Sequence, residues 1–160
     1  TIGIGLDNLL YYYDYPANPR EELLRQAFTS FAASIDTDLQ PIVAEANAEL
    51  VTRYGNCMRK GITMTCPGFY GPQGRRLRLG SIIQQRFFDS IGQFSFEGQR
   101  ITNFEMETSA ILGLARMLGH RATACNGIIA NRITGKFSTD PKDTEERLIE
   151  QVLENAIRKV

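Results

Sequence analysis

The stretch from Gly61 to Arg75, GITMTCPGFYGPQGR, joins a strand to a loop and guides the interpretation of the whole chain. Its first half is short, apolar and rich in β-branched residues, which favours a strand. Its second half, from Gly68 onward, holds too much glycine and proline to continue as a helix or central strand. The stretch therefore places an aromatic ring, an amide and a guanidinium on one loop at the end of a strand.

That loop and a second segment, Phe104 to Glu107 (FEME), predict two walls of one pocket for a nucleoside. The amide of Gln73 offers a donor and an acceptor beside the donor fork of Arg75, which matches the edge of uracil. The second segment offers carboxylates where a strand gives way to a helix, and a carboxylate accepts hydrogen bonds from both cis hydroxyls of a ribose. Composition and spacing alone also allow an ordinary surface turn and solvated carboxylates at a helix start.

Length and charge narrow the class of protein. The chain has 160 residues, a length that predicts one domain. It has 18 Lys and Arg against 18 Asp and Glu, and this zero net charge provides no overall electrostatic field to attract nucleic acid or anionic membranes. No apolar run approaches the roughly 18 residues of a membrane span, so we expect a soluble, cytoplasmic protein. Three cysteines without a CxxC pair, and His120 at a predicted helix end, make a disulfide framework or a zinc site unexpected.

Apolar periodicity predicts an α/β layered domain with a parallel or mixed sheet. In the first helix we expect Glu21 to face water, and in the last we expect Asp143 and Glu146 to form a capping box. The last strand should be buried on both faces around Ile128 and Ile129. Strands are predicted over residues 2–13, 61–65, 101–105 and 121–130, and helices over 18–33, 41–54, 81–91, 107–118 and from 143 onward.

Three separated motifs carry a resemblance to a known family. GITMTCPGFYGPQGR, NFEMETSAILGLARMLGHRA and GIIANR, in this order, resemble the C-terminal half of the uridine phosphorylases in the nucleoside phosphorylase I family, over roughly residues 58 to 160. The resemblance implies a layered mixed sheet flanked by helices, without the N-terminal part of that sheet. Residues 1–160 would then be the C-terminal portion of a single domain, and we expect a longer complete protein.

The resemblance also implies roles for individual residues. Gln73 and Arg75 match the groups that bind the uracil edge, and Phe69 matches the aromatic that lines the pocket against base and sugar. Glu107 matches the carboxylate that takes the 2′- and 3′-hydroxyls of the ribose, while Met106 packs against the sugar ring. Gln73, Arg75 and Glu107 are therefore the expected catalytic residues.

Further residues are implied as neighbours of these. Glu105 would be an additional contact, and Ile129 and Ala130 would form an apolar wall against the base. Arg132 matches a second arginine that supports the uracil end through Arg75 or water. From the sequence alone, Ile129 is equally well explained as strand core.

Asn131 separates the branches of the family. Purine enzymes and nucleosidases carry an aspartate in this segment to protonate the leaving purine at N7, and Asn131 cannot do so. We therefore expect reversible phosphorolysis of uridine to uracil and ribose 1-phosphate, with phosphate as co-substrate and no metal or other cofactor. The alternatives are a purine phosphorylase or nucleosidase of the same fold, or a non-catalytic nucleoside-binding fragment.

The resemblance implies a homo-oligomer, either a dimer or a hexamer. The family's phosphate site, a glycine-rich strand end with arginines from the N-terminal half, has no counterpart in these residues. Arg76 and Arg78 are close to the loop, but we expect them to be solvated.

Overall fold

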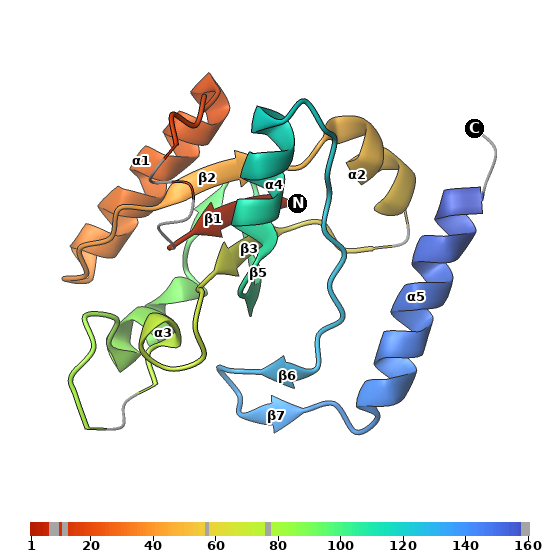
Figure 1. Ribbon diagram of the computed structural model, residues 1–160. Coiled ribbons are helices and arrows are strands. Elements are labelled where there is room, and N and C mark those ends of the chain that lie inside the picture. Colours follow the sequence, from red (N-terminus) through yellow and green to blue (C-terminus); the bar gives the residue numbers. More distant parts are fainter. Residues whose placement is uncertain (7–9, 11–12, 57, 76–77, 158–160) are drawn as a thin grey trace.

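The computed structural model describes residues 1–6, 10, 13–56, 58–75 and 78–157 of the chain (Figure 1). Its centre is a five-stranded sheet with the strand order β2-β1-β3-β5-β4. β1, β3 and β5 are parallel to one another, whereas β2 and β4 run antiparallel at the two edges, so the predicted mixed sheet is confirmed. The strands are β1 (Ile2–Gly5), β2 (Ile42–Glu45), β3 (Ile62–Thr65), β4 (Ser95–Phe96) and β5 (Gln99–Glu105).

Helices cover both faces of this sheet, and a small hairpin and a last helix follow beyond it (Figure 1). Within the described residues no helix is both long and apolar enough to cross a membrane. The helices are α1 (Pro19–Ser34), α2 (Ala48–Tyr54), α3 (Gln85–Ile91), α4 (Thr108–Met117) and α5 (Pro141–Ile157), with a 3-10 turn η1 (Gly71–Gln73) and the hairpin strands β6 (Ala130–Asn131) and β7 (Lys136–Phe137).

The main hydrophobic core lies on the face of the sheet that α1 and α3 cover. Ile4 and Met64 point to this face and are fully buried against the rings of Phe28 and Phe87. The two rings meet edge to face with centroids 6.3 Å apart, an arrangement that aromatic pairs prefer. Alternating strand residues put every second side chain here, which explains the buried apolar positions of β1 and β3.

The opposite face carries small and polar side chains, and α4 lies across it (Figure 1). A Cβ atom on Gly3 would lie 3.0 Å from the Cα atom of Ser109 in α4. Glycine at this position therefore lets the backbone of α4 approach the backbone of β1 more closely than a side chain would allow. The first turn of α4 sits directly on the sheet as a result.

α1 begins where the sequence predicts a helix start, at Asn18 and Pro19, and a reciprocal cap closes this end of the helix. The side chain of Asn18 accepts a bond from the Glu21 backbone N–H at 2.9 Å, and the Glu21 carboxylate accepts from the Asn18 N–H at 2.8 Å. The expectation that Glu21 faces water is wrong, because Glu21 is only 1 % exposed. Its burial is possible because every part of its carboxylate meets a donor.

These donors tie three elements together around Glu21. Its Oε1 accepts from the Tyr15 hydroxyl at 2.9 Å and from the Glu45 backbone N–H at 2.7 Å, and its Oε2 accepts from Arg116 of α4 at 2.6 Å. Burial raises the pKa of Tyr15, and the neighbouring Glu21 charge raises it further. The network joins α1, β2 and α4 on one side of the sheet.

The predicted helix over residues 41–54 is wrong in its first half. Ile42–Glu45 form β2, which pairs antiparallel with β1, and the helix begins only at Ala48. Asn47 caps it by accepting a bond from the Leu50 N–H at 3.2 Å. The apolar residues before Asn47 fit a strand pattern as well as a helical one, so their pairing with β1 determines that they form a strand.

Other boundaries also differ from the predictions. The strand expected over residues 2–13 ends at Gly5, while residues 7–9 and 11–12 lie outside the described residues, as does Arg76. The helix expected from residue 81 begins at Gln85. A turn at Glu97 and Gly98, both with positive φ, joins β4 to β5 in a hairpin that the sequence did not predict.

The C-terminal part departs most from expectation. Residues 121–129 form no strand within the described chain, and Ile128 and Ile129 are 52 % and 37 % exposed rather than buried on both faces. The predicted capping box at Asp143 is also wrong. α5 begins at Pro141, and the Asp140 side chain accepts from the Asp143 N–H at 2.9 Å, as a cap one turn earlier does.

Candidate functional site

The two segments singled out in the sequence leave the sheet at the same edge. β3 and β5 are parallel neighbours, and their last residues, Thr65 and Glu105, lie in register. The loop after β3 and the start of α4 therefore begin side by side, at the carboxyl ends of parallel strands where ligands of α/β proteins usually bind.

The loop after β3 turns through η1 and buries Gln73, which is 9 % exposed. Arg75 donates to the Gln73 side-chain oxygen at 2.7 Å and also to the Phe69 carbonyl. Because a guanidinium only donates, this bond turns the amide oxygen of Gln73 toward Arg75 and leaves its NH₂ group on the other side. The loop thus presents an oriented amide and guanidinium.

Phe69 completes this group. The guanidinium carbon of Arg75 lies 3.7 Å from the centroid of the Phe69 ring, within cation–π range, and the ring itself is 57 % exposed. A planar ligand can reach both the exposed ring and the edge of the guanidinium. The sequence prediction that these residues share one loop surface agrees with this geometry.

Arg132 reaches the same group from the turn of the β6–β7 hairpin. It donates to the backbone carbonyl of Gln73, and its guanidinium carbon lies 4.2 Å from the centroid of the Phe88 ring. Burial lowers the pKa of Arg132, and the nearby charge of Arg75 lowers it further. Two guanidinium groups that repel each other favour a ligand with electron-rich oxygens. The bond from Arg132 goes to Gln73 rather than to Arg75.

The acidic segment after β5 divides into residues with different surroundings. The Glu105 carboxylate accepts bonds from protein groups with both oxygens, from the Thr65 hydroxyl at 2.6 Å and from the Thr108 N–H at 2.6 Å. Glu107 occupies the N-cap position of α4, and its exposed carboxylate has no hydrogen bond or ion pair within the described part of the chain. Met106 between them is 38 % exposed.

Ile129, Ala130 and Asn131 lead into the hairpin that carries Arg132. The Ile129 carbonyl accepts from the Ser138 N–H at 2.7 Å, and Ala130 is exposed at the start of β6. The Asn131 side chain accepts from the backbone N–H groups of residues 133 and 134 at 3.0 Å each, which closes a turn. These residues shape the hairpin through their backbone and turn contacts.

The structure therefore joins Phe69, Gln73, Arg75 and Arg132 into one cluster by direct contacts. Glu107 belongs to the adjacent strand end, and among the described residues no hydrogen bond or ion pair links it to the cluster. Thr65 and Phe88 were not predicted as part of this region. Only the strand register and the packing of the hairpin reveal them.

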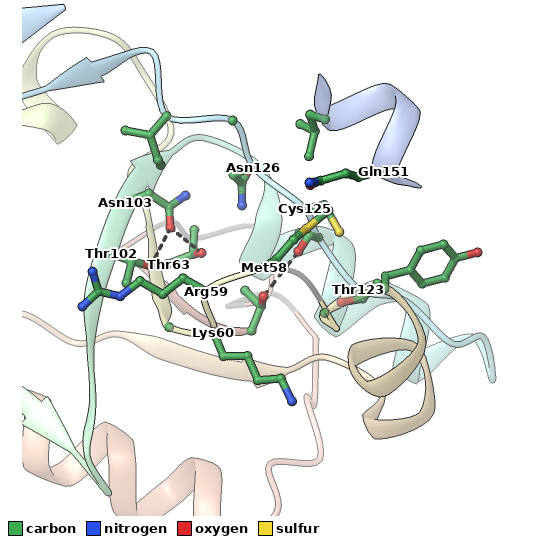
Figure 2. Close-up of a pocket in the computed structure, with 18 of the residues that line it drawn as sticks. Met58, Arg59, Lys60, Thr63, Thr102, Asn103, Thr123, Cys125, Asn126 and Gln151 are labelled. Carbon is green, nitrogen blue, oxygen red and sulfur yellow. Dashed lines mark hydrogen bonds between the residues drawn. The ribbon is translucent and has the colours of Figure 1, made fainter. Parts of the chain in front are cut away.

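A cavity of about 620 Å³ lies elsewhere, and none of the predicted site residues lines it (Figure 2). It borders the first halves of β3 and β5, residues 123–128 and α5. Its lining mixes amides and hydroxyls, such as those of Asn103 and Thr63, with apolar side chains and with the cations Arg59, Lys60, Arg100 and Arg147. Burial raises the pKa of the Cys125 thiol at its wall, which disfavours a thiolate nucleophile. The side chains that the sequence analysis predicts for a nucleoside site lie instead in the cluster near the other ends of β3 and β5.

Comparisons with known proteins bear on the family and the fold of the chain. No protein-family model matches the chain. Over 109 residues it is 32 % identical to a uridine phosphorylase of Thermococcus kodakarensis, a match that covers 67 % of the chain and 36 % of that relative. Among solved structures, a Trypanosoma brucei nucleoside phosphorylase with uridine phosphorylase activity superposes with a TM-score of 0.72 and 24 % identity, covering 96 % of the chain and 55 % of that protein.

A uridine phosphorylase of the oomycete Phytophthora capsici superposes with a TM-score of 0.52 and 16 % identity, covering 99 % of the chain and 57 % of that protein. At these identities the solved structures establish the fold, which is that of the nucleoside phosphorylases. The chain spans about half the length of each. The resemblance and the fold class predicted from the sequence are confirmed: the chain is similar to uridine phosphorylases and has the fold of the nucleoside phosphorylases.

Proposed function

We propose that the complete protein catalyses reversible phosphorolysis of uridine, and that residues 1–160 are the C-terminal portion of its single domain. Phosphate attacks C1′ of the ribose as the bond from C1′ to N1 of uracil breaks. The products are uracil and ribose 1-phosphate. Phosphate is a substrate, and the reaction requires no metal or other cofactor. The relationship to uridine phosphorylases supports this proposal.

The residues of the cluster act on the leaving uracil. The electron pair of the breaking bond spreads onto the ring carbonyls, where donors of Arg75 and Gln73 stabilise it by hydrogen bonds already aimed at those positions. Arg132 holds the Gln73 backbone and adds positive charge nearby. Phe69, Ile129 and the neighbouring Ala130 line the faces of the base.

The ribose is held from the start of α4. The free carboxylate of Glu107 accepts bonds from the 2′- and 3′-hydroxyls, and Met106 packs against the ring. These contacts hold the sugar in the orientation that the attack on C1′ requires. Such positioning lowers the barrier to reaction without a protein nucleophile. Asn131 cannot protonate a purine at N7, and its side chain already serves the hairpin turn, so pyrimidines are the expected substrates.

The observation that carries the proposal is the bond from Arg75 to the buried Gln73 side chain, beneath the exposed Phe69 ring. It fixes a flat set of donors beside an aromatic face, as a pyrimidine requires. An ordinary surface turn has no need to bury a glutamine or to stack its arginine on phenylalanine.

The test is to substitute Arg75→Ala in the complete protein. We expect the kcat/KM for uridine phosphorolysis to fall by about 100-fold or more, because one transition-state donor is lost. Arg78→Ala is the matched control, since Arg78 is an exposed arginine of the same loop. An Arg75→Ala protein that folds and keeps its rate would refute the assignment.

The alternatives are separated by product analysis of the wild-type protein. Uridine, inosine and deoxyuridine are offered with and without phosphate. Cleavage that proceeds without phosphate identifies a nucleosidase, and a preference for inosine identifies a purine enzyme. Binding of uridine without any turnover identifies a non-catalytic protein. Phosphate-dependent release of uracil is the result expected here.

We also propose a cytoplasmic homo-oligomer, a dimer or a hexamer, that binds neither nucleic acid nor membranes. Equal numbers of acidic and basic residues support the last part, because they provide no net field for polyanions. Sedimentation of the complete protein measures the oligomer directly.

A further inference from the structure

We propose that Thr65 is a positioning residue for the ribose, which acts by holding Glu105 so that Glu107 stays free to bind the sugar. This inference rests on the proposed function and refines the role of Glu105. In this arrangement Glu105 serves the protein backbone rather than the substrate. Thr65 lies at the end of β3 and touches the reaction only through its neighbours.

The hydroxyl of Thr65 is fully used by the protein. Thr65 is completely buried, donates to Glu105 Oε1 at 2.6 Å and accepts from the backbone N–H of Ser109 at 2.9 Å. One hydroxyl therefore links three elements: the end of β3, the end of β5 and the first turn of α4. A hydrogen bond to an ionised carboxylate is stronger than one between neutral groups, and this one is short.

The other oxygen of Glu105 completes the start of α4. It accepts from the backbone N–H of Glu107 at 2.8 Å and from that of Thr108 at 2.6 Å. The first N–H groups of a helix have no partner within the helix, and a side chain at the N-cap position usually satisfies them. Here the N-cap residue is Glu107, which makes no such side-chain bond.

Because Glu105 caps α4, the carboxylate of Glu107 remains free to bind the ribose hydroxyls. If its own carboxylate capped α4, it would point along the helix and could not take two sugar hydroxyls. Glu105 caps the helix from two residues earlier, and the Thr65 hydroxyl keeps Glu105 in the required rotamer. Loss of that hydroxyl frees Glu105 to turn, and the backbone of Glu107 loses its fixed place.

Thr63 provides a matched control in the same strand. It is 1 % exposed, and its hydroxyl donates at 2.8 Å to Asn103 of β5, just as the Thr65 hydroxyl donates to Glu105. Both pairs join residues that lie in register on β3 and β5. Within the described residues the Asn103 side chain makes no hydrogen bond to α4, so the two threonines differ in what their partners hold.

The experiment compares Thr65→Val with Thr63→Val in the complete protein. Calorimetry measures the Kd for uracil, which lacks a ribose, and for uridine. For Thr65→Val we expect uracil affinity within about twofold of wild type, and uridine affinity and kcat/KM lowered by about tenfold, as the loss of one charged hydrogen bond predicts. Thr63→Val should leave the ratio of the two affinities unchanged, and Thr65→Ser should restore it.

Glu105→Gln serves as a second variant if Thr65→Val folds poorly, and it should change the ratio in the same direction. A ratio unchanged in both variants, or an equal loss for uracil and uridine, would overturn the role of Thr65 while leaving the proposed function intact. A wild-type protein that binds neither ligand would instead overturn the proposed function, and the role of Thr65 with it.

Discussion

Residues 1–117 and residues 118–157 differ in how they use their apolar side chains. In the first region Phe28 is fully buried, and helices cover both faces of the sheet. In the second region Phe137 is 76 % exposed, and Leu153 of α5 is 57 % exposed. Both α1 and α5 have apolar residues at helical spacing. The comparison teaches that periodicity predicts which face of a helix is apolar, whereas a neighbouring surface determines whether that face is buried.

The sharpest test of this comparison is to shorten one aromatic residue in each region. Phe28→Ala should lower the free energy of unfolding by about 3 to 5 kcal/mol, because a filled core site becomes a cavity. Phe137→Ala should change it by less than about 0.5 kcal/mol, as surface substitutions do. Urea unfolding followed by circular dichroism measures both. Similar losses for the two variants would show that the second region also has a core.

Ion pairs offer a second test, with a smaller expected effect. Glu21 binds Arg116 inside the first region, whereas Glu49 binds Arg121 at an exposed pair that joins α2 to the second region. Glu21→Gln should cost about 2 to 3 kcal/mol, since charged hydrogen bonds are lost from a buried site. Glu49→Gln should cost at most about 1 kcal/mol, as is typical of exposed pairs. Equal costs in urea unfolding would contradict the difference in burial.

The smallest expected effect concerns Glu22, the partly exposed neighbour of Glu21 on α1. Hydrogen bonds from Arg25, and then from Gln26, lower the pKa of Glu22 to about 2 from its ordinary value of 4.5. A lowered folded-state pKa stabilises the protein above pH 4.5, and this contribution is lost as the pH falls from 4.5 toward 2. The difference in urea midpoint between wild type and Glu22→Gln should therefore shrink over that range. A difference that does not change with pH would count against the bonds to Glu22.

The sequence predictions were correct for features that depend on residues close together in the sequence, and wrong for features that depend on contacts between distant residues. The start of α1 was predictable because Asn18 and Pro19 act on their own neighbours. The strand over Ile42–Glu45 was not, because its pairing with β1 decides between strand and helix. Burial of Glu21 likewise depends on donors from β2 and α4, which no local pattern reveals.

The same reasoning applies to the candidate site. Gln73 and Arg75 are two positions apart on one loop, so their contact could be predicted from spacing and turn residues. The bond between Thr65 and Glu105 spans forty positions and depends on the register of β3 and β5. The contact of Arg132 with the Gln73 carbonyl depends on how the hairpin packs. The sequence therefore predicted the residue types of the candidate site but not the bonds that orient them.

The close approach of β1 and α4 at Gly3 has a consequence for how the protein tolerates change. Position 3 lies on a strand, yet a methyl group there would press on Ser109, two residues from Glu107. It would push the first turn of α4 away from the sheet and displace the backbone of Glu107, the residue proposed above to hold the ribose. Under the proposed function, variation at this glycine is a route by which sugar preference can change without substitution of any residue of the candidate site.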